Sequence, residues 1–243
     1  MGKAVRVTDS VAANLELIQA RIADAAAKAG RKPEDVQLIA VSKKQDAEKV
    51  RAAFDAGQPI FGESRVQEAR AKIPLLPSSV RWHFMGYLQR NKIRHALPLF
   101  ELFHSVDSYA LACDIERIAE EEGMRPRVLL EVNVAGEGTK IGFSPENVKA
   151  SMEALLQLGR VEIEGLMAIP PFAAEAEDSR RYFVMLRELR DELERDFKVR
   201  LPQLSMGMSN DYAVAIEEGA TFVRVGTAIF GDRAPAAKKE PEQ

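Results

Sequence analysis

One lysine stands where a nucleophile is useful. Lys43 follows the apolar run VQLIAV (36–41) and Ser42. An amine held between apolar walls is desolvated, which lowers the pKa of the lysine and frees it to attack a carbonyl carbon. An ordinary surface lysine is also common just past a strand, as the neighbouring Lys44 illustrates. Lys43 alone therefore does not decide between a functional and a solvated side chain.

Two segments near the end of the chain have the composition of an anion site. In LSMGMSND (204–211), Ser209 is placed to cap a following helix, and in FVRVGTAIFG (222–231), Gly226 and Thr227 open a short helical turn. Amides at helix starts, with hydroxyls beside them, bind anions. Either segment alone is explained by a capped helix after a tight turn. Together with the lysine, the two segments favour a phosphorylated carbonyl ligand.

Three further polar residues lie in or at the ends of apolar runs. Arg224 lies one residue before the second of these turns, and burying an unpaired guanidinium is costly, so it needs a hydrogen-bond acceptor. A pyridine nitrogen is one candidate acceptor, and a carboxylate such as Glu63 is another. His83 and Asn133 are candidates to line a ligand, although a core histidine and a strand-end turn explain them equally well.

The elements that position these residues alternate regularly. Apolar runs, typical of strands covered on both faces, end near Ser42, Phe61, Met85, Val106, Val134, Ile169, Met206 and Val225. Helical spacing is found up to Gly30 and over 45–56, 65–74, 88–97, 108–123, 144–158, 176–197 and 210–218. Eight such units predict an α/β fold, a single (β/α)8 TIM-type barrel with an extra N-terminal helix. A doubly wound open sheet is the alternative, because spacing alone cannot close a barrel.

In such a barrel, the polar strand ends meet at one rim, where barrel enzymes carry their chemistry. We predict one barrel over residues 1–233. Residues 234–243, which are Ala, Pro, Lys, Glu and Gln, are predicted to be a disordered tail.

Composition excludes several classes of protein. The formal charge of −3, from 34 basic and 37 acidic residues among 243, gives no electrostatic case for nucleic acid. The single cysteine, Cys113, rules out an intrachain disulfide, and the three histidines lack metal-ligand spacing. No stretch approaches the ~20 apolar residues of a membrane span, and the N-terminus lacks the apolar run of a signal peptide. We therefore expect a cytoplasmic protein.

Eight motifs, in order, carry a family resemblance over roughly residues 10–233. The chain resembles the pyridoxal phosphate homeostasis proteins, a fold-type III group related to the barrel domain of alanine racemase. The motifs are AVSK (40–43), FGESRVQE (61–68), WHFMGYLQRNK (82–92), HSVDS (104–108), EVNV (131–134), GLMAIPP (165–171), LSMGMSNDY (204–212) and VRVGTA (223–228).

The resemblance implies pyridoxal 5′-phosphate as the cofactor, held as a Schiff base by Lys43. It also implies Ser209, Gly226 and Thr227 around the phosphate, and Arg224 at the pyridine nitrogen. Ser64 stands where the family often has Asn, which puts a polar contact with the cofactor from that position in doubt.

Binding this cofactor does not make an enzyme. Racemisation needs a second proton-transfer residue on the opposite face of the cofactor. In alanine racemase an additional β-domain supplies it, and this chain ends soon after its last barrel element. Arg224 beside the ring nitrogen would also keep that nitrogen unprotonated, which weakens the ring as an electron sink. We expect vitamin B6 homeostasis, by storage, buffering or delivery to apo-enzymes, without substantial turnover.

Two alternatives stay open. In a pyridoxal-phosphate-dependent amino-acid racemase, Tyr212 or a residue of a second subunit would supply the missing proton. A Lys-dependent aldolase acting on a sugar phosphate would use the same barrel, lysine and phosphate site without any cofactor. The sequence leaves open the oligomeric state, the recipient proteins, the affinity for cofactor and any residual activity.

Overall fold

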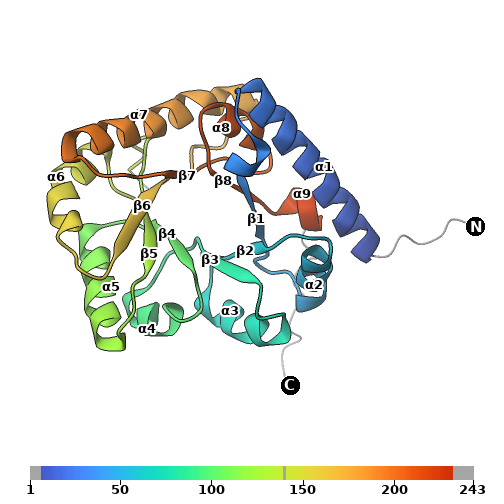
Figure 1. Ribbon diagram of the computed structural model, residues 1–243, viewed down its shortest axis with the longest axis horizontal. Helices are drawn as coiled ribbons and strands as arrows, with labels where there is room; N and C mark the ends of the chain where they lie inside the picture. Colours follow the sequence, from blue (N-terminus) through green and yellow to red (C-terminus); the bar gives the residue numbers. More distant parts are fainter. Residues whose placement is uncertain (1–6, 139–140, 232–243) are drawn as a thin grey trace, which may run out of the picture.

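Eight parallel strands close into a barrel. The structure, a computed structural model, describes residues 7–138 and 141–231. Each strand pairs with the next along the chain, and β8 pairs with β1, so the sheet order is β1 to β8 around a closed ring (Figure 1). The strands are β1 (Gln37–Val41), β2 (Ile60–Glu63), β3 (Arg81–Phe84), β4 (Leu102–Val106), β5 (Arg127–Glu131), β6 (Glu162–Met167), β7 (Gln203–Ser205) and β8 (Phe222–Val225).

Helices surround the barrel. They are α1 (Val7–Lys28), α2 (Ala47–Asp55), α3 (Val66–Lys72), α4 (Ile93–Ala96), α5 (Tyr109–Glu122), α6 (Pro145–Leu156), α7 (Arg180–Phe197), α8 (Tyr212–Glu217) and α9 (Thr227–Phe230). Short 3₁₀ turns are η1 (Pro33–Asp35), η2 (Ile73–Leu75), η3 (Arg90–Lys92) and η4 (Ala176–Ser179). The extra helix α1 packs against α2, α8 and α9, where the last unit of the barrel meets the first (Figure 1).

The apolar runs form strands because each strand is covered on both faces. One set of side chains fills the barrel interior: Ile39, Ile60, Leu102, Leu129, Met167 and Phe222. The alternate side chains, such as Ala40, Phe61 and Phe103, pack against the helices in a second, larger apolar layer. Since side chains alternate along a strand, a residue two positions after an interior one also faces the interior. This rule decides which strand-end residues reach the barrel mouth.

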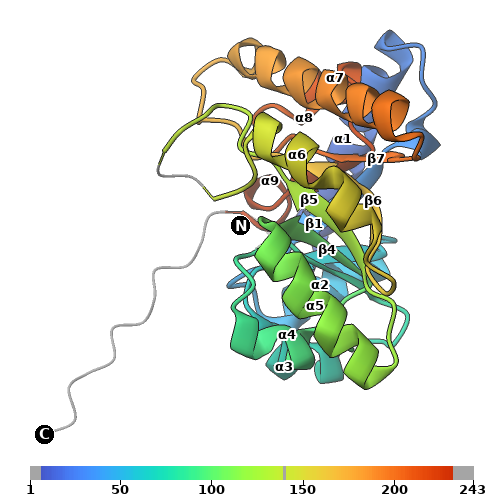
Figure 2. The same cartoon turned by 90° about the vertical axis from the view of Figure 1, so that its left-hand side faces the viewer.

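The two ends of the barrel differ in character. At the N-terminal ends of β3 to β6, Arg81 and Arg127 bind Glu101 at 2.7 and 2.9 Å, and Arg127 also pairs with Glu164. Ion pairs at this end serve stability, because barrel enzymes carry their chemistry at the other end. There, the loops that follow β5 and β6 extend on the same side as α9 (Figure 2).

The predicted barrel and its N-terminal helix are confirmed, and the open-sheet alternative is wrong because β8 pairs with β1. The helix predicted over 88–97 is mostly the 3₁₀ turn η3 followed by the short α4. The predicted tail, 234–243, lies outside the described residues, so the domain limits stay a prediction. In the described part of the chain, no helix is long and apolar enough to cross a membrane, and no cluster of His, Cys, Asp and Glu fits a metal ion.

Candidate functional site

A cavity of about 290 Å³ opens at the C-terminal mouth of the barrel. Its polar lining comes from loops after β1, β2, β7 and β8 and from one strand residue: Lys43, Ser64, Ser209, Asn210, Asp211, Arg224, Gly226 and Thr227. Its apolar lining is Val41, Met85, Met167, Ile169, Pro171, Phe172, Ala173 and Met208. A mainly apolar cavity with a few convergent polar groups is the usual form of a small-molecule site. Six of the eight predicted site residues, the lysine included, therefore line one cavity, and His83 and Asn133 do not.

Lys43 reaches the cavity because of its place after β1. Val41 and Lys43 line the cavity, whereas Ser42 between them is fully buried. The chain then turns sharply: Gln45 N donates to Ser42 O at 3.0 Å, and Lys44 has a left-handed φ of 62°. Lys43 is half-buried and Lys44 is exposed, which separates the two neighbouring lysines.

The last two loops bring hydroxyls together on another side of the cavity. Thr227 Oγ1 lies 3.3 Å from Ser209 Oγ, although the two residues belong to different βα units. The predicted turn at Gly226 and Thr227 is confirmed, since Gly226 is the N-cap of α9. Ile229 N and Phe230 N both donate to Gly226 O, so the first two amides of α9, those of Thr227 and Ala228, are the ones suited to a ligand.

The predicted capping role of Ser209 is wrong. The N-cap of α8 is Asp211, and its side chain accepts from Met208 N at 2.6 Å. The chain makes a separate turn before the helix, in which Asp211 N and Tyr212 N both donate to Met208 O. This turn delays the helix by two residues and leaves Ser209 at the cavity.

Arg224 is 4% exposed and lines the floor of the cavity. Its Nη1 donates to Ser205 Oγ at 2.7 Å and its Nη2 to Ala168 O at 2.9 Å. Among the described residues, these bonds account for two of its five N–H donors. Burial lowers the pKa of Arg224 to about 10, against the opposing charges of Glu131 and Asp211, so the guanidinium stays protonated at neutral pH. The alternative ion pair with Glu63 is wrong, because that carboxylate binds Lys72 behind the strand wall.

Below Arg224, a chain of neutral groups continues into the barrel. His104 Nδ1 lies 2.8 Å from Ser205 Oγ, and His104 Nε2 lies 2.9 Å from His83 Nδ1. Burial lowers the pKa of His83 to about 3 and that of His104 well below its usual range, so both rings are neutral. Since Arg224 can only donate, Ser205 Oγ accepts from it. The Ser205 hydroxyl is then left to donate to His104 Nδ1, and His104 Nε2 to donate to His83 Nδ1. His83 is thus a core histidine, away from the cavity lining.

Two other predicted site residues have different positions. Asn133 does not line the cavity, and its Nδ2 donates to Glu137 O at 2.8 Å within the loop after β5. Ser64 does line the cavity. Its carbonyl approaches Gly86 so closely that a Cβ on that glycine would lie 2.2 Å from Ser64 O. The glycine after β3 is therefore required for the position of the loop that carries Ser64.

Sequence reasoning missed Glu131 at the end of β5. Burial raises the pKa of Glu131 to about 7, the positive charge of Arg224 lowers it, and Asp107 raises it further. Its position two residues after the interior Leu129 was the available signal, because alternation turns it toward the barrel axis. A carboxyl that titrates near neutral pH thus lies within electrostatic reach of Arg224.

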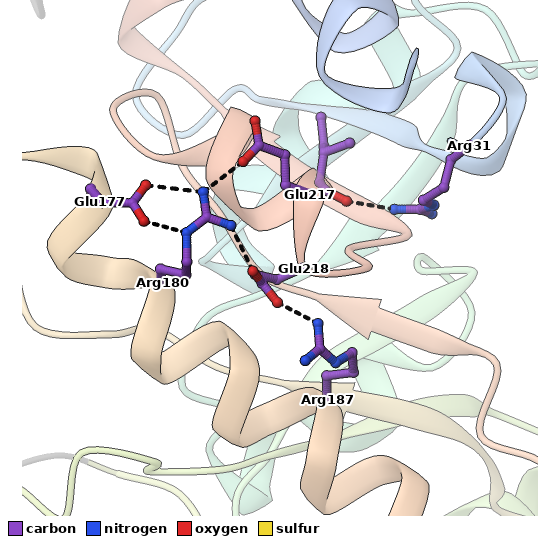
Figure 3. A network of polar contacts seen from close by, with 7 residues as sticks. Arg31, Glu177, Arg180, Arg187, Glu217 and Glu218 are labelled. Atoms are coloured by element: carbon purple, nitrogen blue, oxygen red, sulfur yellow. Dashed lines mark hydrogen bonds and ion pairs between the residues drawn. The ribbon is translucent and has the colours of Figure 1, made fainter. Parts of the chain in front are cut away.

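An ionic network fixes the helix that follows Ser209. Arg180 of α7 binds Glu217 and Glu218 at 2.6 Å each and also pairs with Glu177, while Arg187 pairs with Glu218 (Figure 3). From the other side, Arg31 donates to the carbonyls of Ile216 and Ala220 at 2.9 and 2.8 Å. Helix α8 is therefore held by both α7 and the region after α1, which fixes one end of the Ser209 loop.

Comparison with known proteins gives a consistent result. The family model described as "Alanine racemase, N-terminal domain" matches residues 13–234. A "Pyridoxal phosphate homeostasis protein" of Aquifex aeolicus is 46% identical over 220 residues, covering 90% of this chain and 96% of the relative. One of Pseudomonas aeruginosa is 44% identical over 235 residues, covering 94% and 99%.

Solved structures agree with this result. PipY of Synechococcus elongatus PCC7942, solved with PLP bound, is 41% identical and has a TM-score of 0.80, covering 91% of this chain and all of that one. Alanine racemase of Clostridium difficile 630 is 19% identical with a TM-score of 0.71, covering 94% of this chain and 58% of that one. The second likeness concerns the fold alone.

Proposed function

Because this chain belongs to the family of the alanine racemase N-terminal domain, we propose that it binds pyridoxal 5′-phosphate at the barrel mouth and serves in vitamin B6 homeostasis. The observation that carries the proposal is the meeting of three chemical functions in one cavity: the amine of Lys43, the hydroxyls of Ser209 and Thr227, and the guanidinium of Arg224. The PLP-bound PipY structure, at 41% identity, supports this ligand over a sugar phosphate.

The donor set fits each part of the cofactor. The amine of Lys43 would hold the aldehyde carbon of pyridoxal phosphate as a Schiff base, with the carbonyl oxygen leaving as one water. The hydroxyls of Ser209 and Thr227 and the amides of Thr227 and Ala228 suit the phosphate. Arg224, held as a permanent donor, suits the ring nitrogen. The methionines and Val41 on the apolar side would exclude water from the cofactor ring.

A carrier fits the site better than a racemase. An arginine that donates to the ring nitrogen opposes its protonation and so weakens the ring as an electron sink. Tyr212, the residue of this chain considered as a second proton donor, is 4% exposed and does not line the cavity. The proposal therefore is storage, buffering or delivery, in the cytoplasm, with apo-enzymes that receive the cofactor as partners.

Two neighbouring lysines provide the test. The purified protein, incubated with pyridoxal phosphate, is expected to turn yellow, and borohydride should fix the cofactor on the peptide that contains Lys43. Lys43→Ala should lose the colour and the label, whereas Lys44→Ala, a change at the exposed neighbour, should keep both. Stoichiometric label in Lys43→Ala contradicts the Schiff-base assignment.

A second measurement separates the carrier from the racemase. The cofactor-loaded protein is mixed with amino acids in deuterium oxide, and exchange at Cα is followed by NMR. We expect no exchange above that of free pyridoxal phosphate. Rapid, protein-dependent exchange would show turnover and overturn the carrier proposal.

A further inference from the structure

Each polar group of Ser42, the residue before Lys43, makes a hydrogen bond. Ser42 N donates to Gly62 O at 3.0 Å, and Ser42 Oγ donates to Glu63 Oε1 at 2.7 Å. Ser42 O accepts from Lys72 Nζ at 2.8 Å, in addition to the turn bond from Gln45 N. Since side chains alternate, fixing Ser42 on the helix side of the strand fixes the direction of Lys43 toward the cavity.

Lys72 is the centre of this arrangement. It is the last residue of α3 and is 6% exposed. Its ammonium binds three acceptors: Ser42 O, Glu63 Oε1 at 2.6 Å and Glu68 Oε1 at 3.2 Å. Glu68 Oε1 also accepts from Lys44 N. The backbone is therefore held on both sides of Lys43, at the carbonyl before it and at the amide after it.

Stability does not explain this cluster well. A buried ion pair is often no better than an apolar pair unless every remaining oxygen is bonded. Glu63 Oε2 is buried and has no hydrogen-bond partner among the described residues. At the other end of the same two strands, neutral Gln58 binds Leu38 O and Ile60 O, each at 2.7 Å. A neutral amide is therefore sufficient to join β1 and β2 at that end. The charged residues Lys72 and Glu63 lie at the opposite end, beside Lys43.

The turn itself requires such support. Lys44 has a φ of 62°, a left-handed conformation that costs free energy for a residue with a side chain. A strained backbone persists only where its surroundings hold it, and here the bonds of Lys72 and Glu68 hold it. Released from them, the turn would relax and the amine of Lys43 would sample other directions.

We propose that Lys72, together with Glu63 and Glu68, is a positioning residue that aims the amine of Lys43 into the cavity. This inference rests on the proposed function, because it assigns a role toward the lysine that binds the cofactor. A nucleophile that is already oriented reacts faster, since its orientation is not achieved during the reaction. The cluster should therefore affect how fast the cofactor attaches more than how stable the barrel is.

The test compares two buried polar groups on the same pair of strands. The variant Lys72→Met/Glu63→Gln removes both charges and keeps an acceptor for Ser42. The matched control, Gln58→Leu, breaks two bonds to β1 and β2 at their far end. The rate of yellow colour formation with pyridoxal phosphate, the dissociation constant and the melting temperature are measured for each. We expect about tenfold slower attachment or more in the double variant and an unchanged rate in the control.

A third variant tests the inference even if the double variant does not fold. Glu68→Ala removes the half-buried acceptor of Lys44 N and should slow attachment in the same direction, by less. A wild-type rate in a folded double variant, or equal slowing in Gln58→Leu, overturns the inference. Those results differ from failure of the proposed function, in which the wild-type protein itself gains no borohydride-fixed label at Lys43.

Discussion

The two cavity residues with the most specific chemistry are supported in opposite ways. Lys43 is held from outside the strand wall by a charged cluster, Lys72, Glu63 and Glu68. Arg224 is held from inside the barrel by a neutral chain that begins at Ser205. Lys72 and Glu63 of the first support and Ser205 of the second are buried.

The difference follows from burial and from whether a counter-charge lies beside each buried group. In the barrel interior, burial lowers the pKa of both His83 and His104, and for His104 the charge of Arg224 lowers it further, so the chain stays neutral. Behind the strand wall, the ammonium of Lys72 and the carboxylate of Glu63 compensate each other. Burial raises the pKa of Glu63, and the bonds from Lys72 and Ser42 oppose that rise. Burial thus keeps the interior chain neutral, whereas the buried charges behind the strand wall persist as a pair.

The largest expected effect comes from breaking the charged support at one partner. Lys72→Met leaves the carboxylate of Glu63 buried without its counter-charge, which should lower the free energy of unfolding by about 3–5 kcal/mol. Removing both charges, in Lys72→Met/Glu63→Gln, should recover most of this loss. Urea unfolding of the cofactor-free proteins measures both. If the single variant is as stable as the double variant, the two charges do not compensate each other as the comparison requires.

A smaller effect is expected from the neutral support. Ser205→Ala removes the acceptor of Arg224 and the partner of His104, and an unsatisfied buried polar group costs about 1–3 kcal/mol. The ¹⁵N shifts of the His104 ring should also change, because the hydroxyl that fixes its tautomer is gone. Ser105→Ala, which removes a buried hydroxyl bonded to Gly86 O, is the control and should leave those shifts unchanged. Unaltered His104 shifts in Ser205→Ala would mean that the chain is not coupled.

The same comparison shows what the sequence can predict. Lys43, Gly226, Thr227 and Arg224 were found because local patterns place them: each lies at or near the end of an apolar run, and alternation fixes its face. The barrel followed from eight such runs. The sequence predicted Ser209 at the site but gave it a wrong role as a helix cap. The reason is that a turn of four residues cannot be distinguished in the sequence from the first turn of a helix.

The supporting residues were not predictable in that way. Lys72 is the last residue of a helix whose sequence is typical of an ordinary surface helix. Its partners Ser42 and Glu63 lie 30 and 9 residues away in the sequence. His104 and Ser205 are 101 residues apart, and nothing in either segment indicates the bond. Such contacts depend on the closure of the barrel and on the directions of the side chains. The hydrophobic periodicity of a short segment contains no information on either. The position of His83 was left open for the same reason, since a strand-end histidine can face the cavity or the core.

The last expected effect, and the one that probes the charge of Arg224 itself, is the pH dependence due to Glu131. Its pKa of about 7 lies above the value near 4.3 of an unfolded chain, so the folded protein binds this proton more tightly. The resulting stabilisation is complete below about pH 4.3 and is lost as pH rises through about 7. Relative to Glu131→Gln, the wild-type protein should therefore lose stability across that window, measured by urea unfolding at several pH values. In an Arg224→Met background the window should extend to higher pH, because the guanidinium favours the charged carboxylate. A difference between wild type and Glu131→Gln that stays constant with pH would show that Glu131 is solvated, and the interior would then hold Arg224 by neutral partners alone.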